Sequence, residues 1–184
     1  MRKVITGLQE YIWLNEKFTL FHDVDLNQIV KVAAERVMQE CPGVEFILDA
    51  AHLGFVEGDP EQLGLLFYHL LSNAVKFRKE DKAMVHIRGD VMKQNKFRSV
   101  KNRYQYEDFL RVDIRDEGTG FKSEFKETIF ELFRKLHHNE GQGLGLALCK
   151  KIVENHGGVI TADSKVNLYT EIKIWLPIKQ SVIQ

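Results

Sequence analysis

DEGTGF (residues 116–121) opens the stretch of sequence that decides the fold, and it is followed by FELFRKL (130–136) and GQGLGLAL (141–148). Glycine adopts a positive φ readily and lets a ligand approach the backbone closely. The second glycine cluster leads into a helical pattern, and a helix N-terminus presents free N–H groups and a positive dipole end to phosphate. Asp116 ends a strand-like run, where its carboxylate could accept a hydrogen bond from the edge of a base. A glycine cluster alone is more often a simple turn than a ligand site. A binding site is indicated here by the order of the two clusters and by a further motif that precedes them in the chain.

That partner is HLLSNAVKF (69–77), at the end of a helical pattern. Asp59 is a good N-cap and Pro60 suits the first helical position, so the helix is predicted to begin there. Its apolar residues recur at helical spacing and predict a core-facing stripe. A separate polar stripe consists of His69, Asn73 and Lys76. Such a stripe is ordinarily a solvated helix face, but the neighbouring motifs favour a binding surface.

Taken together, these motifs resemble those of sensor histidine kinases. HLLSNAVKF, DEGTGF, the pair Phe130 and Phe133, and GQGLGLA appear in the order of the asparagine box, first glycine box, phenylalanine box and second glycine box. In that family the boxes form the catalytic, ATP-binding domain, which belongs to a wider class shared with gyrase, the Hsp90 chaperone and MutL. The resemblance covers about residues 20–178, and four ordered motifs are far more specific than one.

The resemblance implies a role for each matching residue. Asn73 would coordinate Mg²⁺ on the triphosphate and Lys76 would contact phosphate, while Asp116 would bind the exocyclic amino group of adenine. Phe121 and the phenylalanine pair would hold a lid over the nucleotide, and Arg134 could reach the γ-phosphate. The residues assigned to nucleotide binding are Asp116, Gly118, Gly120, Phe121, Arg134, Gly141, Gly143, Leu144 and Gly145.

Three places depart from the family pattern. Sensor kinases often carry Asn at position 69 and hydrolytic relatives carry Glu, which polarises the attacking water; His69 is neither, so we expect a phosphate-side contact and doubt hydrolysis by the relatives' mechanism. The lid between Phe133 and Gly141 is shorter than usual, and Gln142 stands where a Thr is common. The connection 164–170 lacks the usual glycine-rich turn and the Thr that follows it.

The predicted fold is an α/β (α+β) two-layer sandwich, a mixed sheet of about five strands with helices on one face. Helices are expected over 3–16, from Asp25 to Pro42, from Asp59 to about 79, and over 144–158; strands are expected over 44–48, 54–58, 82–92, 106–116, 159–163 and 171–177. The basic stretch 93–106 interleaves lysine, arginine and aromatic residues, as nucleic-acid patches do, but the solvated end of a long hairpin is favoured.

Residues 1–19 are predicted to be the end of a preceding dimerisation helix with its linker, and residues 20–184 the catalytic domain. The alternative, an N-terminal helix that simply packs on the domain, is left open. No histidine has the sequence context of the phosphoacceptor helix, so the acceptor is expected on a separate domain. P-loop, dinucleotide-binding and eukaryotic-type kinase motifs are absent from the sequence.

The overall composition argues against several classes of partner and location. The formal net charge of the 184 residues is zero, so no broad attraction to nucleic acid or anionic membrane is expected. Cys41 and Cys149 lack metal spacing and are expected to be reduced in a cytoplasmic protein. No apolar run is long enough to span a bilayer, and no signal peptide is recognised.

The function implied is phosphoryl transfer from Mg-ATP to a histidine on a dimerisation domain, within a two-component pathway that includes a response regulator. Two alternatives stay open. One is a degenerate module that binds nucleotide and signals by docking, which the short lid and His69 would suit. The other is an ATP hydrolase of the gyrase or MutL kind, against which the missing glutamate argues.

Overall fold

The structure is a computed structural model that describes residues 2–16, 21–97, 104–135 and 143–180. Its elements are α1 (Arg2–Glu16), β1 (His22–Asp25), α2 (Leu26–Glu40), β2 (Glu45–Ala50), β3 (Phe55–Gly58), α3 (Pro60–Lys76), β4 (Lys82–Phe97), β5 (Tyr104–Asp116), the 3-10 turns η1 (Ser123–Phe125) and η2 (Thr128–Phe130), α4 (Gly145–Asn155), β6 (Val159–Lys165) and β7 (Tyr169–Pro177). Within these residues, no helix is long and apolar enough to cross a membrane.

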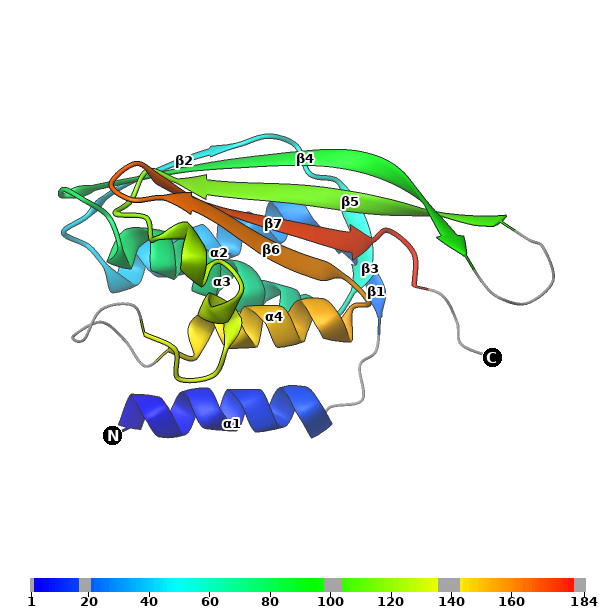
Figure 1. Cartoon of the computed structure of the whole chain (residues 1–184), viewed down its shortest axis with the longest axis horizontal. Coiled ribbons are helices and arrows are strands. Elements are labelled where there is room, and N and C mark those ends of the chain that lie inside the picture. Colours follow the sequence, from blue (N-terminus) through cyan, green and yellow to red (C-terminus); the bar gives the residue numbers. More distant parts are fainter. Residues whose placement is uncertain (1, 17–20, 98–103, 136–142, 181–184) are drawn as a thin grey trace.

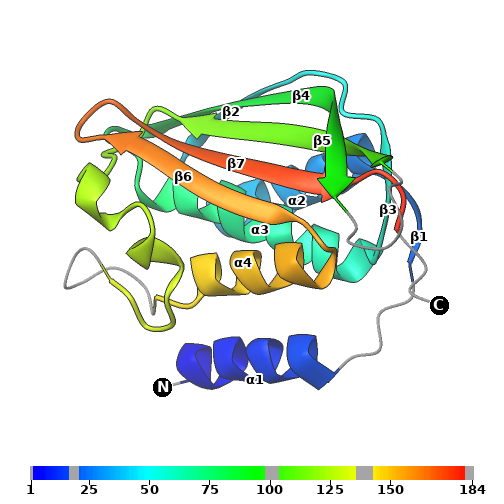
Figure 2. The same ribbon diagram turned by 45° about the vertical axis from the view of Figure 1, so that its right-hand side comes forward.

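Five strands form one mixed sheet in the order β2-β4-β5-β7-β6. Strand β2 runs parallel to β4, and the remaining neighbours are antiparallel. Helices α2, α3 and α4 cover one face of this sheet, and α1 lies outside α4 (Figures 1 and 2). The predicted sandwich, with a mixed five-stranded sheet and helices on one face, is therefore confirmed. Strands β1 and β3 form a separate two-stranded antiparallel ribbon.

Helix α3 contributes both to the core and to the cavity described below. Its apolar stripe is buried against the sheet, and its polar stripe of His69, Asn73 and Lys76 lines the cavity. The Asp59 side chain accepts hydrogen bonds from the backbone N–H groups of Glu61 and Gln62, and Pro60 follows it, as predicted. The fully buried side chains of the stripe are Leu63, Leu66, Phe67 and Leu71. They belong to the same core cluster as buried strand residues, including Val85, Ile87, Val112 and Ile174.

The far end of α4 is fastened to the start of α3. Gly157, at φ +68°, donates to the carbonyl of Glu154, and Gly158 donates to that of Val153, which is the Schellman arrangement of a helix end. The buried His156 ring links the two helices: Nδ1–H donates to the Ile152 carbonyl at 2.7 Å, and Nε2 accepts from the Asp59 N–H at 3.0 Å. Burial lowers the pKa of His156 and keeps the ring neutral.

The β4–β5 hairpin extends further than its hydrophobic pattern indicated. Pairing continues from Val85–Asp116 to Phe97–Tyr104, beyond the predicted end at residue 92. Backbone pairing does not need apolar side chains, so alternation marked the strand only to residue 92. The interpretation of 93–106 as the end of a long hairpin is confirmed for its described residues. Within the basic stretch 93–106, residues 93–97 belong to β4 and residues 104–106 belong to β5. Residues 98–103 lie outside the described residues.

Candidate functional site

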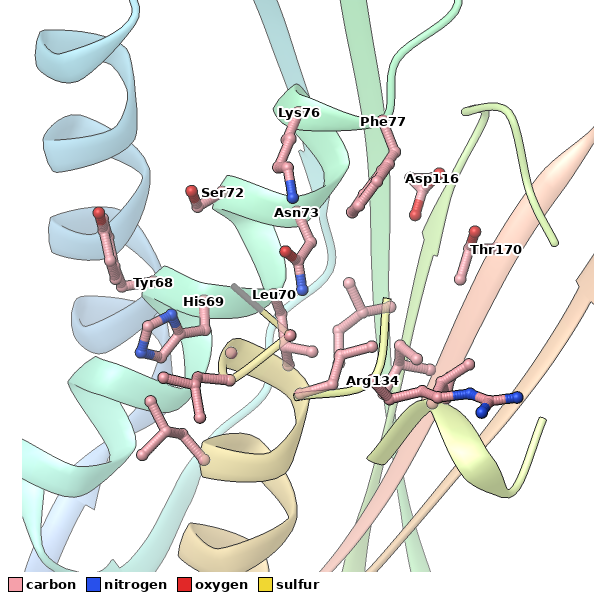
Figure 3. Close-up of a pocket in the computed structure, with 18 of the residues that line it drawn as sticks. Tyr68, His69, Leu70, Ser72, Asn73, Lys76, Phe77, Asp116, Arg134 and Thr170 are labelled. Carbon is pink, nitrogen blue, oxygen red and sulfur yellow. The ribbon is translucent and has the colours of Figure 1, made fainter. Parts of the chain in front are cut away.

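A cavity of about 510 Å³ lies between α3, the start of α4 and the loop that follows β5 (Figure 3). It brings together most of the predicted site residues from four separate stretches of sequence. Those that line it are His69, Asn73, Lys76, Asp116, Gly120, Phe121, Arg134, Gly143, Leu144 and Gly145. Gly118 lies beside the cavity without lining it, and Gly141 lies outside the described residues.

Asp116 supplies a carboxylate at one end of the cavity. Burial raises its pKa to about 6, against the opposing effects of backbone hydrogen bonds from Gly118 and Thr170 and of the nearby Lys79 charge. The Gly118 N–H donates to Oδ1 at 2.9 Å. Above that pKa the group is a desolvated anion, which is a strong acceptor for an N–H donor such as the amino group of a base.

The two glycines after Asp116 shape the loop. A Cβ at Gly118 would lie 2.6 Å from both Asp116 Oδ1 and the Phe77 carbonyl oxygen, so only glycine fits there. Gly120 has φ +61°, and a Cβ there would collide with the Lys165 carbonyl. Gly118 therefore orients the Asp116 carboxylate through its N–H group, and Gly120 lines the cavity.

Asn73 lies on α3 with its carboxamide directed into the cavity, and Lys76 follows one turn later (Figure 3). Among the described residues, no group of three or more His, Cys, Asp or Glu side chains could hold a metal ion. Mg²⁺ bound to a triphosphate needs few protein ligands, because phosphate oxygens and water complete its shell. The single Asn73 carboxamide oxygen fits that requirement.

The start of α4 forms the opposite wall. No side chain caps its N-terminus, so its first N–H groups are open to an anion. Gly143 precedes it at φ +69°, and a Cβ there would lie 2.5 Å from the Arg134 carbonyl oxygen. The glycine therefore lets the backbone at Gly143 approach the backbone of Phe133 and Arg134 closely.

Comparison with known proteins identifies this arrangement. Residues 58–180 match the model of the family described as histidine kinase-, DNA gyrase B-, and HSP90-like ATPase. The chain belongs to this family. Cyanobacterial phytochrome A of Nostoc sp. is 36% identical over 108 residues, which are 57% of this chain and 12% of the relative. The histidine-protein kinase ArlS of Staphylococcus haemolyticus is 29% identical over 163 residues, 84% of this chain and 32% of the relative. This chain thus spans a third or less of the length of these curated relatives.

Solved structures agree with the family. The mycobacterial sensor histidine kinase MprB superposes with a TM-score of 0.69 at 25% identity, covering 88% of this chain and all of that one. Full-length ShkA in complex with AMPPNP gives a TM-score of 0.71 at 18% identity, over 97% of this chain and 36% of that one. The predicted resemblance to the catalytic, ATP-binding domain of sensor histidine kinases is therefore confirmed.

The aromatic residues of this ATPase domain separate into two groups. Phe130 is 7% exposed and belongs to the core, with Phe121 packed against it. Phe133 has φ 62° and is 54% exposed. The Arg134 guanidinium lies 5.4 Å from the Phe125 ring centroid and points away from Asn73 (Figure 3). A contact between Arg134 and a γ-phosphate therefore stays a prediction.

Two parts of the cavity wall were not predicted from the sequence. Thr170 pairs with Asp116 in the β5–β7 register and lines the cavity beside it, so the hairpin does supply a threonine there (Figure 3). Alternation along β7 could have indicated this position. Gly7 and Glu10 of α1 also line the cavity, because α1 packs on α4 through the buried Leu14. Packing of this helix on the domain was one of the two alternatives left open, but no local pattern indicated that it would reach the cavity.

Proposed function

We propose that this chain is the catalytic domain of a sensor histidine kinase, which transfers the γ-phosphoryl group of Mg-ATP to a histidine on a separate dimerisation domain. One observation carries the proposal: Asp116 and Asn73, from different motifs, line a single cavity that also receives the N-terminus of α4. A base-binding carboxylate, a metal-binding amide and an anion-binding helix end are the parts that a nucleoside triphosphate requires.

Asp116 would select adenine. Its carboxylate accepts from the exocyclic amino group, whereas the carbonyl of guanine at that position offers no donor. Thr170 would support the same edge of the base with its hydroxyl, which lies beside Asp116 in the paired strands. The Gly118 N–H already occupies one lone pair of Oδ1, which fixes the orientation of the carboxylate before the base arrives.

At the other end, Asn73 and Lys76 would face the phosphates, with the first N–H groups of α4 opposite them. Mg²⁺, held by the Asn73 amide oxygen, would neutralise charge on the phosphate oxygens. The work of these residues is positioning and charge neutralisation, without a covalent intermediate on the protein. Lys76 contributes a point charge suited to a phosphate oxygen.

The remaining partners follow from the proposed reaction. The domain would work in the cytoplasm beside its own phosphoacceptor domain, in a homodimeric parent whose phosphohistidine serves a response regulator. Residues 1–19 would be the end of the dimerisation helix with its linker, and residues 20–184 the catalytic domain. No contact with nucleic acid or membrane is needed for this role.

Phosphotransfer to a supplied acceptor domain tests the proposal. The chain is incubated with γ-labelled ATP, Mg²⁺ and a histidine-kinase dimerisation hairpin, and acid-labile label on the hairpin is counted. Label that depends on the native chain and falls at least tenfold with Asn73→Ala is expected, because a lost transition-state contact of this kind costs about 1.4 kcal/mol or more. ATP binding without any transfer would instead favour the docking module.

A further inference from the structure

The His69 ring is held between α1 and α4. Its Nε2 lies 3.7 Å from Oε2 of Glu10, and its side chain is 17% exposed. Within the described part of the chain, Nε2 is buried and has no hydrogen-bond partner at ordinary distance. A buried ring nitrogen is costly without a partner, so Glu10 is the group placed to accept from it after a small movement.

The other nitrogen of the ring faces the start of α4. A Cβ at Gly145 would lie 3.4 Å from His69 Nδ1 and 3.9 Å from the Asn73 amide nitrogen. His69 therefore stands beside the helix end proposed to bind phosphate, while Asp116 lies at the opposite side of the cavity (Figure 3). The imidazole thus connects a carboxylate on α1 to the phosphate end of the site.

Packing fixes the position of that carboxylate. A Cβ at Gly7 would lie 2.7 Å from Leu144 Cδ1, so the absence of a side chain at Gly7 lets Leu144 pack directly against α1. Leu14 is 2% exposed, and the Asn155 side chain donates to its carbonyl at 2.9 Å. Glu10 lies between these two anchors and is 33% exposed, within reach of the cavity.

We propose that Glu10 of α1 and His69 of the catalytic domain form a carboxylate–imidazole pair that gives this chain ATP hydrolysis without a histidine acceptor. The proposal rests on the proposed function, since it requires ATP in the same cavity. His69 would take a proton from water through Nδ1 as the water oxygen attacks the γ-phosphorus. The bond from that phosphorus to the β–γ bridging oxygen breaks, its electron pair stays on ADP, and inorganic phosphate forms.

Glu10 acts through His69 as a positioning residue. Its carboxylate accepts from Nε2–H, which leaves Nδ1 unprotonated toward the phosphate end and balances the imidazolium formed by proton transfer. Position 69 lacks the glutamate of the hydrolytic relatives, and in this structure Glu10 of α1 brings a carboxylate to the same place.

Steady-state ADP release, measured without acceptor, tests the pair. The test variants are Glu10→Gln, Glu10→Asp and His69→Gln. Turnover of Asn73→Ala sets the baseline, and Glu16→Gln, at an exposed position on the same helix as Glu10, is the matched control. We expect kcat to fall about 100-fold in His69→Gln, the usual contribution of a general base. Glu10→Gln should lower kcat at least tenfold with less than threefold change in KM, and Glu10→Asp should restore part of it.

Two results would overturn the inference. The first is native turnover no higher than that of Asn73→Ala although ATP binds, which would leave the proposed kinase function intact. The second is a kcat of Glu10→Gln equal to that of Glu16→Gln. Failure of the native chain to bind ATP in a direct titration would contradict the proposed function itself, so the two failures are distinguishable.

Discussion

Replacing Asp116 with Asn should stabilise the domain while removing its affinity for ATP. Burial raises the pKa of Asp116 from 3.8 to about 6, so an ionised carboxylate at neutral pH is a cost to folding. Each unit corresponds to about 1.4 kcal/mol, and the shift of roughly two units gives at most about 3 kcal/mol at pH 7.5. The amide keeps an oxygen for the Gly118 N–H and carries no charge.

The sign of the pH dependence follows from the raised pKa. The carboxylate is neutral in both states at low pH, so it carries no penalty below the unfolded pKa of 3.8. The penalty grows as pH rises and reaches its full value above the folded pKa near 6. The advantage of Asp116→Asn should therefore shrink to about 1 kcal/mol at pH 4.5.

The assay is urea unfolding of both proteins at pH 7.5 and pH 4.5, followed by titration with ATP at pH 7.5. Asp108→Asn, an exposed position on β5, is the matched control and should stay within about 0.5 kcal/mol of the native chain. With Oδ1 held by Gly118, the amide presents a donor to the adenine amino group, so affinity should fall about 100-fold. An Asp116→Asn protein that is less stable at pH 7.5, or equally shifted at both pH values, would refute the reasoning.

Three further predictions concern other parts of the molecule. Asn73→Ala should abolish the dependence of ATP affinity on Mg²⁺, measured by titration with and without the metal; a dependence that survives would place the metal elsewhere. Gly143→Ala should destabilise the domain by about 1–3 kcal/mol in urea, because φ is +69° and the Arg134 carbonyl blocks a Cβ; an unchanged midpoint would contradict this. Because the pKa of His156 is lowered below 6.5, its contribution to stability is complete above pH 6.5 and is lost as pH falls below it. The native chain should therefore lose more stability than His156→Asn between pH 7.5 and pH 5.5, and parallel losses would contradict the prediction.

The sequence predicted those features whose signals are local. Asp59 and Pro60 located the start of α3, and the ordered motifs assigned Asn73 and Asp116 to one site, where both line the same cavity. Strand β1 was missed because HDVD, with Val24 as its single apolar residue, is too short to show alternation. Its pairing with β3 is a long-range choice that no local pattern encodes.

The parts of the site that were missed depend on how distant elements meet. Thr170 reaches the cavity only because the β5–β7 register places it opposite Asp116. No role was predicted for Glu10, which lines the cavity because α1 packs closely on α4. Helix docking is set by side-chain fit, such as the approach of Gly7 to Leu144, and hydrophobic period does not specify it.

The most direct test of the central claim is calorimetric titration of the native chain with Mg-ATP and Mg-GTP, beside Asp116→Ala and the exposed control Asp108→Ala. The account predicts that the native chain and the control bind ATP alike, that GTP binds at least tenfold more weakly, and that Asp116→Ala binds neither tightly. Equal affinity of Asp116→Ala and the native chain for ATP would contradict the claim that this cavity binds the adenine nucleotide through Asp116.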